Sequence, residues 1–345
     1  MAAPGHAFLG TELPVIQAPM AGVQGSALTI AVCEAGGLGS LPCAMLAAEA
    51  MGKELAAIRA GTDRPFNLNF FCHTPPVADS TRETRWHDAL RPYFDELGVD
   101  PASIVIGPGR RPFSLEAVEL IEALRPPVVS FHFGLPGDAL LARVRRSGAR
   151  IFSSATTVAE ALWLQARGVD AVIAQGLEAG GHRGHFLSDD LGLQSGTFAL
   201  LPQIVAAVRV PVIAAGGIAD AKGVAAALRL GAAAVQLGTA YLRCPEATTS
   251  AVHRAALASD AARHTALTNL FTGRPARGIV NRLMRELGPI GTVAPAFPLA
   301  TAAIAPLRAA AEGRGSGDFS PLWCGQNASG CRAVPAAELT RGFVA

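Results

Sequence analysis

Residues 168–186 read GVDAVIAQGLEAGGHRGHF, a short apolar run that leads into a loop rich in glycine and histidine. Residues 171–174 are apolar throughout and Gln175 is the first polar side chain after them, which is typical of a buried strand in a parallel sheet. Glycines let a backbone lie close to a flat or charged ligand, and a histidine titrates near neutral pH. The stretch therefore predicts a buried strand whose following loop forms a binding or catalytic site, with a turn that holds a hydrogen-bonded histidine as the alternative.

The order of a short apolar run and a longer amphipathic one recurs along the chain, which is typical of βα units around a parallel sheet. Eight such units predict an α/β protein with a (β/α)8 TIM barrel, whose closed sheet leaves no free edge, and a doubly wound open sheet is the alternative. The expected strands are residues 15–18, 37–41, 66–71, 128–133, 150–154, 171–175, 211–215 and 234–238. The expected helices of these units are residues 26–35, 49–60, 115–124, 138–147, 158–167, 198–208 and 221–230.

Two segments depart from this pattern. The connection between the third and fourth expected strands is long enough to carry an extra helix over residues 81–97. After the eighth strand, residues 245–287 are predicted to be mainly helical. We therefore expect three parts, namely a barrel over residues 1–243, a helical elaboration over the barrel mouth at 244–313, and a C-terminal tail at 314–345 that packs back on the barrel.

The composition is that of a globular protein with a large core, because half of the 345 residues are apolar. The net charge is only +2 and no basic run alternates with aromatic residues, so nucleic acid is not an expected partner. No apolar run has the length of a membrane span and the N-terminus lacks the pattern of a leader, so we expect no membrane partner and a cytoplasmic location. The six cysteines lack CxxC spacing, and we expect neither a disulfide framework nor a metal site.

In barrels of this kind the active site lies where the strands end, so the residues just after each strand are the candidates. The loops AAGGIAD (214–220) and QLGTAYL (236–242) follow the last two strands, where free backbone N–H groups and helix N-termini favour a phosphate. The other strand ends carry amides, hydroxyls and backbone groups rather than paired charges. The expected ligand is a neutral ring system with a phosphate, for which FMN is the natural candidate, and glycines that only turn the chain are the alternative.

Several reaction classes lack the residues that they need. A glycosidase requires two facing carboxylates and an enolase-type site requires several acidic metal ligands, yet only Glu178 lies near an expected strand end. A Schiff-base aldolase requires a lysine inside the barrel, and the two lysines of the chain, Lys53 and Lys222, lie in expected helices. None of these activities is therefore expected.

Taken together and in order, the strand-end motifs resemble those of the nitronate monooxygenases, formerly called 2-nitropropane dioxygenases. The resemblance implies an FMN-dependent flavoprotein, an oxidoreductase with a role in detoxification. Its substrates would be small-molecule alkyl nitronates and, where they are accepted, neutral nitroalkanes. The enzyme would oxidise them with O2 to carbonyl compounds and nitrite. The resemblance extends from about residue 14 to residue 282 and rests on PVIQAPMAGV, GGLGSL, PFNLNFFCHTPP, SFHFGLP, GVDAVIAQGLEAGGHRG, VPVIAAGGIADAKGVAAAL, GAAAVQLGTAYL and GRPARGIVNR.

The resemblance also implies roles for individual residues. His182 matches the catalytic histidine, which removes the α-proton of a neutral nitroalkane or steadies the nitronate, a task that suits a base with a pKa near neutrality. His132 is a second candidate for the substrate pocket, with a hydrogen-bonded barrel histidine as the alternative. His182 and Arg183 would supply positive charge to the nitro oxygens, whereas His185 would be structural. The residues implied in cofactor binding are Ala18, Pro19, Met20, Asn69, Gln175, Gly180, Gly181, Gly216, Gly217, Gln236, Leu237, Gly238 and Thr239.

Two other interpretations stay open at this point. The APM, GGLG and EAGGH motifs are also similar to those of flavin-dependent enoyl-acyl carrier protein reductases and NADH:quinone reductases, although FNLNFFCHTPP and GRPARGIVNR favour the monooxygenases. An FMN-binding protein without catalysis is a third class, which a histidine beside the flavin argues against. The sequence leaves open the physiological nitronate, the use of neutral nitroalkanes or NAD(P)H, and the oligomeric state.

Overall fold

The computed structural model describes residues 6–77, 79–104 and 109–344, and its largest element is a parallel sheet in the order β1-β9-β8-β6-β5-β4-β3-β2. The ends of this sheet meet, because the Leu38 amide donates to the Val15 carbonyl (2.9 Å) and the Gln17 amide to the Leu38 carbonyl (3.0 Å). The predicted (β/α)8 barrel is therefore confirmed and the open sheet is wrong. The strands are β1 (Val15–Gln17), β2 (Gly39–Pro42), β3 (Phe66–Phe71), β4 (Val128–His132), β5 (Arg150–Ala155), β6 (Ala171–Gln175), β8 (Val212–Ala215) and β9 (Ala234–Leu237).

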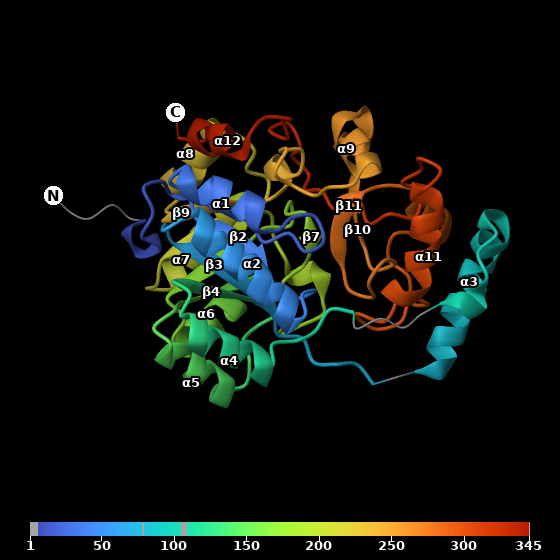
Figure 1. Cartoon of the computed structure of the whole chain (residues 1–345), viewed down its shortest axis with the longest axis horizontal. Coiled ribbons are helices and arrows are strands. Elements are labelled where there is room, and N and C mark those ends of the chain that lie inside the picture. The colour runs from blue at the N-terminus through green and yellow to red at the C-terminus, as the bar shows by residue number, and fades with distance from the viewer. Residues whose placement is uncertain (1–5, 78, 105–108, 345) are drawn as a thin grey trace.

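Helices surround the barrel, as Figure 1 shows, and several begin where a side chain caps them. Thr157 Oγ1 accepts the Glu160 amide at the start of α6, and Asp220 Oδ1 accepts the Gly223 amide at the start of α8. The buried Glu160 carboxylate also accepts the Phe186 amide (2.6 Å), which anchors the loop after β6. The helices of the barrel are α1 (Ser26–Glu34), α2 (Ala48–Gly61), α4 (Leu115–Leu124), α5 (Asp138–Arg146), α6 (Val158–Ala166), α7 (Thr197–Ala207) and α8 (Ala221–Arg229).

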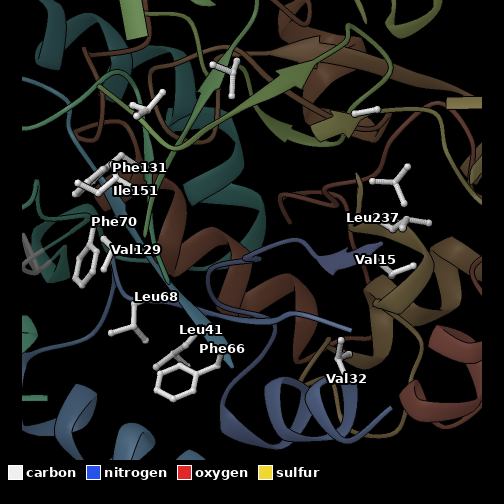
Figure 2. Packing of buried hydrophobic residues seen from close by; sticks show 14 of the residues in the cluster. Val15, Val32, Leu41, Phe66, Leu68, Phe70, Val129, Phe131, Ile151 and Leu237 are labelled. Atoms are coloured by element: carbon white, nitrogen blue, oxygen red, sulfur yellow. The ribbon is translucent and has the colours of Figure 1, made fainter. Parts of the chain in front are cut away.

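Side chains alternate along the barrel strands between the helices and the barrel interior. In β5, Ile151 belongs to the main core between strands and helices, together with Leu68 and Val129 (Figure 2). The next residue, Phe152, belongs to a separate apolar cluster with Ile16, which we assign to the interior. Packing on both faces explains why strands such as β6 and β8 are apolar almost throughout.

A second apolar core lies outside the barrel. Trp86 and Phe94 of α3 (Ser80–Leu97) are buried against Leu283 of α10 (Arg282–Leu287) and Ile304 of α11 (Thr301–Glu312). In Figure 1, α3 lies beside α11, away from the barrel helices. The extra helix of the third crossover thus packs with the C-terminal elaboration, and the division of the chain at residues 243 and 313 stays a prediction.

The prediction that residues 245–287 are mainly helical is wrong. They contain α9 (Ala251–Ala258) and α10, but between these lies an antiparallel pair, β10 (Thr265–Thr268) and β11 (Ala276–Ile279). Gly273 has a φ of 90° and Pro275 lacks an N–H group, so the segment between the two strands turns rather than continuing a helix. β11 also pairs with the short strand β7 (Gly181–His182), which places the elaboration directly on the loop after β6.

The C-terminal segment returns to the barrel. Helix α12 (Ala336–Gly342) lies near α1 in Figure 1, and its Leu339 is buried in the main core. Thr340 Oγ1 lies 2.9 Å from the Tyr241 hydroxyl, which fixes the helix beside the loop after β9. None of the helices that the structure describes combines the length and the apolar character needed to cross a membrane.

Candidate active site

A cavity lies at the carboxyl ends of the barrel strands, where the fold places active sites. Its wall includes every residue that the sequence predicted to be catalytic or to bind the cofactor. The roles themselves stay predictions, since proximity alone does not assign them. These residues are Ala18, Pro19, Met20, Asn69, His132, Gln175, Gly180, Gly181, His182, Gly216, Gly217, Gln236, Leu237, Gly238 and Thr239.

His182 is held in place from three directions. Its backbone is paired with Ala276 of β11, and its Nε2 lies 2.9 Å from Thr272 Oγ1. Its carbonyl oxygen accepts from Gln175 Nε2 (2.9 Å) and from His132 Nε2 (3.2 Å). The imidazole therefore has a fixed position on the cavity wall, which is a requirement for a proton-transferring group.

His132 uses both ring nitrogens inside the protein. Because its Nε2 donates to the His182 carbonyl, its Nδ1 accepts from the Ser154 hydroxyl at 2.6 Å. Burial lowers the pKa of His132 to about 3, and the nearby Arg274 adds to this shift. These contacts favour a positioning role for His132 over the predicted part in catalysis.

Gln175 is engaged in a similar way. Its Nε2 donates to His182, and its Oε1 accepts the Gly184 amide at 2.8 Å. The side chain that was predicted to bind the flavin therefore braces its own loop. Asn69 keeps more freedom toward the cavity, because only its Nδ2 is engaged, by Ser130 Oγ at 2.9 Å.

The electrostatic surroundings keep His182 neutral. Burial is the largest cause that lowers the pKa of His182 well below its usual value, followed by the charge of Arg110 and by the other basic groups that face it, His132, Arg274 and His73. The ring also lies against aromatic side chains, with centroids 5.3 Å from Phe297 and 5.6 Å from Trp323. At neutral pH His182 is therefore a proton acceptor without charge, so the predictions that its pKa lies near neutrality and that it supplies positive charge to the nitro oxygens are wrong.

The hypothesis that Arg183 supplies positive charge to the substrate is wrong. Its guanidinium is fully buried away from the cavity and donates to the carbonyl oxygens of Gln175 (2.8 Å) and Gly176 (2.7 Å) and to Gln194 Oε1 (2.8 Å). All of its donor groups thus serve the turn after β6. The sequence shows the charge of this residue but not the direction of its side chain.

Glu178 and His185 have structural contacts. The Glu178 carboxylate accepts the Thr197 amide (2.7 Å) and the Thr197 hydroxyl (2.9 Å) at the start of α7. The buried His185 lies 3.5 Å from Asp189. Both contacts hold the loop after β6 and agree with the structural role expected for His185.

Comparison with known proteins identifies the family. A family model for nitronate monooxygenase matches residues 4–345. The chain belongs to the nitronate monooxygenase family. A protein named nitronate monooxygenase from Pseudomonas aeruginosa is 44% identical over 98% of this chain and 97% of its own, and one from Paraburkholderia phytofirmans is 44% identical over 96% and 91%. The solved structure of a nitroalkane oxidase from Streptomyces ansochromogenes has a TM-score of 0.87 and 40% identity over 96% of this chain and 95% of its own.

The family resemblance predicted from the motifs is therefore confirmed, and the protein is an enzyme. Nitronate monooxygenases are oxidoreductases, and the family is generally flavin-dependent.

The loops after β8 and β9 form a glycine-rich cradle on the cavity wall, which has the features that a phosphate-bearing ligand requires. Gly216 and Gly217 have φ angles of 120° and 72°, which side chains of L-residues rarely adopt, so their backbone can face a ligand closely. Gln236 Oε1 is buried without a hydrogen-bond partner in the described part of the chain, although buried polar atoms normally have one. An unpaired acceptor beside a glycine cradle fits a ligand that combines an N–H group with a phosphate.

Several cavity residues were not identified from the sequence. They come from the end of β3, the third crossover, α9 and the C-terminal tail. The long crossover and the isolated Trp323 were the signals that could have indicated them, because each is unusual in an otherwise regular barrel. These residues include Phe71, Arg110, His253, Trp323, Gly325 and Asn327.

The C-terminal tail crosses the site next to Gly180. The Gly325 amide donates to Thr239 Oγ1 (2.9 Å) and Asn327 Nδ2 donates to the Gly217 carbonyl (3.0 Å), so the tail is bonded to both cradle loops. A Cβ atom on Gly180 would lie 2.6 Å from the Gly325 nitrogen and 2.7 Å from the Cys324 carbonyl carbon. Only glycine at position 180 allows this contact.

Replacing Gly180 with alanine is therefore expected to displace the tail. Overpacking of this kind costs about 1–3 kcal/mol, so proteolytic cleavage near residues 324–327 should become about tenfold faster. Limited proteolysis followed by mass spectrometry measures the rate at each site. The matched control is Gly52→Ala in α2, where an added Cβ meets nothing within 4 Å. Equal cleavage rates in the Gly180 variant and the wild type would contradict the expectation.

Proposed function

We propose that this protein is an FMN-dependent enzyme that oxidises small-molecule alkyl nitronates with O2 to carbonyl compounds and nitrite. The relatives in Pseudomonas aeruginosa and Paraburkholderia phytofirmans are named for nitronates, and the Streptomyces ansochromogenes structure is titled a nitroalkane oxidase. FMN supplies, when bound, a ring that accepts electrons from the substrate. The observation that carries the proposal is a neutral, rigidly held His182 on the wall of a cavity that also contains a glycine cradle and an unpaired acceptor.

The residues proposed to hold FMN fall into two groups. The backbone of Gly216, Gly217, Gly238 and Thr239 would bind the phosphate at the ends of β8 and β9. The unpaired Gln236 Oε1 would accept a hydrogen bond from an N–H group of the bound cofactor. The other predicted contacts, Ala18, Pro19, Met20, Asn69, Gly180 and Gly181, line the same cavity.

His182 has the tautomer that a general base requires. The Thr272 hydroxyl lies 3.4 Å from the Arg274 carbonyl, to which it can only donate, so it accepts from His182 Nε2–H. The proton on Nε2 leaves Nδ1 with a free lone pair, and no described residue hydrogen-bonds to Nδ1. In the proposed reaction Nδ1 takes the α-proton of a neutral nitroalkane, which generates the nitronate in place.

The proposal is tested by assaying the purified, cofactor-loaded protein with ethyl nitronate and with propionate 3-nitronate in air. We expect nitrite and the corresponding carbonyl compound, and no nitrite when O2 is removed. A visible spectrum of the protein and extraction of its chromophore identify the cofactor independently. Absence of nitrite together with NADH oxidation by an enoyl thioester or a quinone would instead support the reductase alternative.

A further inference from the structure

Arg110 is a buried cation that the fold leaves partly unsatisfied. It lies in the long third crossover, lines the active-site cavity, and is only 9% exposed. Its Nη1 donates to Thr301 Oγ1 at 3.2 Å, but its Nε is buried without any partner, and no carboxylate of the described chain forms an ion pair with it. A buried charge without a counterion is strongly unfavourable. Such an arrangement is expected where an anionic ligand completes the site.

The other basic residues near the cavity do not present a charge to it. Arg183 donates only to protein oxygens, and His182 is neutral. Arg274 donates to the His185 carbonyl and lies over the Phe133 ring, 4.3 Å from its centroid. The Nε of Arg274 has no partner among the described residues, but Arg274 does not line the cavity. Among the described residues that line the cavity, Arg110 is thus the cation that remains for a ligand.

Arg110 and His182 are linked through two adjacent residues, Phe271 and Thr272. Thr301, which accepts from Arg110, donates its own hydroxyl to the Phe271 carbonyl at 3.1 Å. The next residue, Thr272, holds His182 Nε2. The guanidinium and the imidazole, which both line the cavity, are therefore anchored to the same stretch of backbone.

We propose that Arg110 binds the nitro oxygens of the substrate and makes the anionic nitronate, rather than the neutral nitroalkane, the preferred substrate of this site. The inference rests on the proposed function. A guanidinium presents parallel N–H groups that match a planar pair of oxygens, and the negative charge of a nitronate resides on those oxygens. A neutral nitroalkane gains less from the same contact, because its oxygens carry only partial charge.

The test compares Arg110→Met with the wild type on ethyl nitronate, which has no other anionic group, and on neutral nitroethane. Loss of a charge-assisted hydrogen bond is expected to raise KM for ethyl nitronate by about 10- to 100-fold, whereas KM for nitroethane should change by less than about threefold because nitroethane binds as a neutral molecule. The matched control is Arg111→Met, because the Arg111 side chain is exposed next to the same site. Equal changes for the two substrates, or an effect only with propionate 3-nitronate, would overturn the proposal.

Calorimetric titration with nitrate, a planar oxyanion, separates this inference from the proposed function. The wild type is expected to bind nitrate and Arg110→Met to bind it at least about tenfold more weakly, whether or not nitrite is produced from nitronates. If Arg110→Met does not fold, Arg110→Lys and Arg110→Gln replace it, and KM for ethyl nitronate should increase in the order wild type, Lys, Gln. Equal KM values for the Lys and Gln variants would refute a role of the charge.

Discussion

Replacing His182 with glutamine is expected to lower the turnover of nitroethane by about 100- to 10,000-fold, the range that general base catalysis contributes. Glutamine has no group that accepts a proton at neutral pH, so the α-proton of the neutral substrate stays in place. Preformed ethyl nitronate has already lost that proton. Its oxidation is therefore expected to fall much less, by about tenfold or below, with the remaining loss due to altered packing against Phe297 and Trp323.

The measurement is the initial rate of nitrite release from each substrate under identical conditions. His264→Gln serves as the matched control, because His264 is exposed and lies outside the cavity. A visible spectrum of each variant reports whether the cofactor is still bound. If both substrates lose activity equally, or if the variant is purified without cofactor, His182 has a structural role instead of a catalytic one.

The barrel could be predicted because its local signals agree with one another. The run AVIAQ at 171–175, for example, is apolar on both faces, and its helix partner 158–166 begins at a capping threonine. Once eight such units are recognised, topology alone brings the strand ends together. For this reason residues as distant as Met20, Asn69 and Gly238 could be assigned to one cavity before any coordinate was known.

The sequence does not show which strands pair with each other or in which direction a side chain points. β10 and β11 are short, and they are strands because they pair with each other and with β7, so their local pattern could be taken for a helix. The same limit applies to side chains, since Arg183 and Gln175 follow the strand as expected but turn back onto their own loop. Arg110 lines the cavity but belongs to the third crossover, and the path of this crossover depends on how α3 packs in the second apolar core.

The stability of the fold is expected to fall steeply in mild acid. His73, His185 and His253 are almost completely buried, and burial is the first cause that lowers the pKa of each to about 4. In the unfolded chain a histidine has a pKa of about 6.5. Between these values the unfolded state binds more protons than the folded state, so the free energy of unfolding decreases as the pH falls. The full stability is present above about pH 6.5 and is progressively lost toward pH 4.

Each of these histidines contributes a slope of up to about 1.4 kcal/mol per pH unit and the three together about 4 kcal/mol per pH unit, to which His132 and His182 add because burial lowers their pKa values too. Since whole domains are stable by about 5–15 kcal/mol, a descent of two pH units is expected to remove a large part of the stability of the protein. Urea midpoints of the same cofactor-loaded preparation at pH 7.5, 6.5, 5.5 and 5.0 measure the effect. His253→Gln should reduce the slope by about a fifth, because five buried histidines have a lowered pKa and glutamine can keep the hydrogen bond that His253 Nε2 donates to the Trp323 carbonyl without titrating. A midpoint that stays constant from pH 7.5 to 5.0 would show that the buried imidazoles reach water. The histidines around the cavity would then lack the lowered pKa, and the role of His182 as a neutral base depends on that lowered pKa.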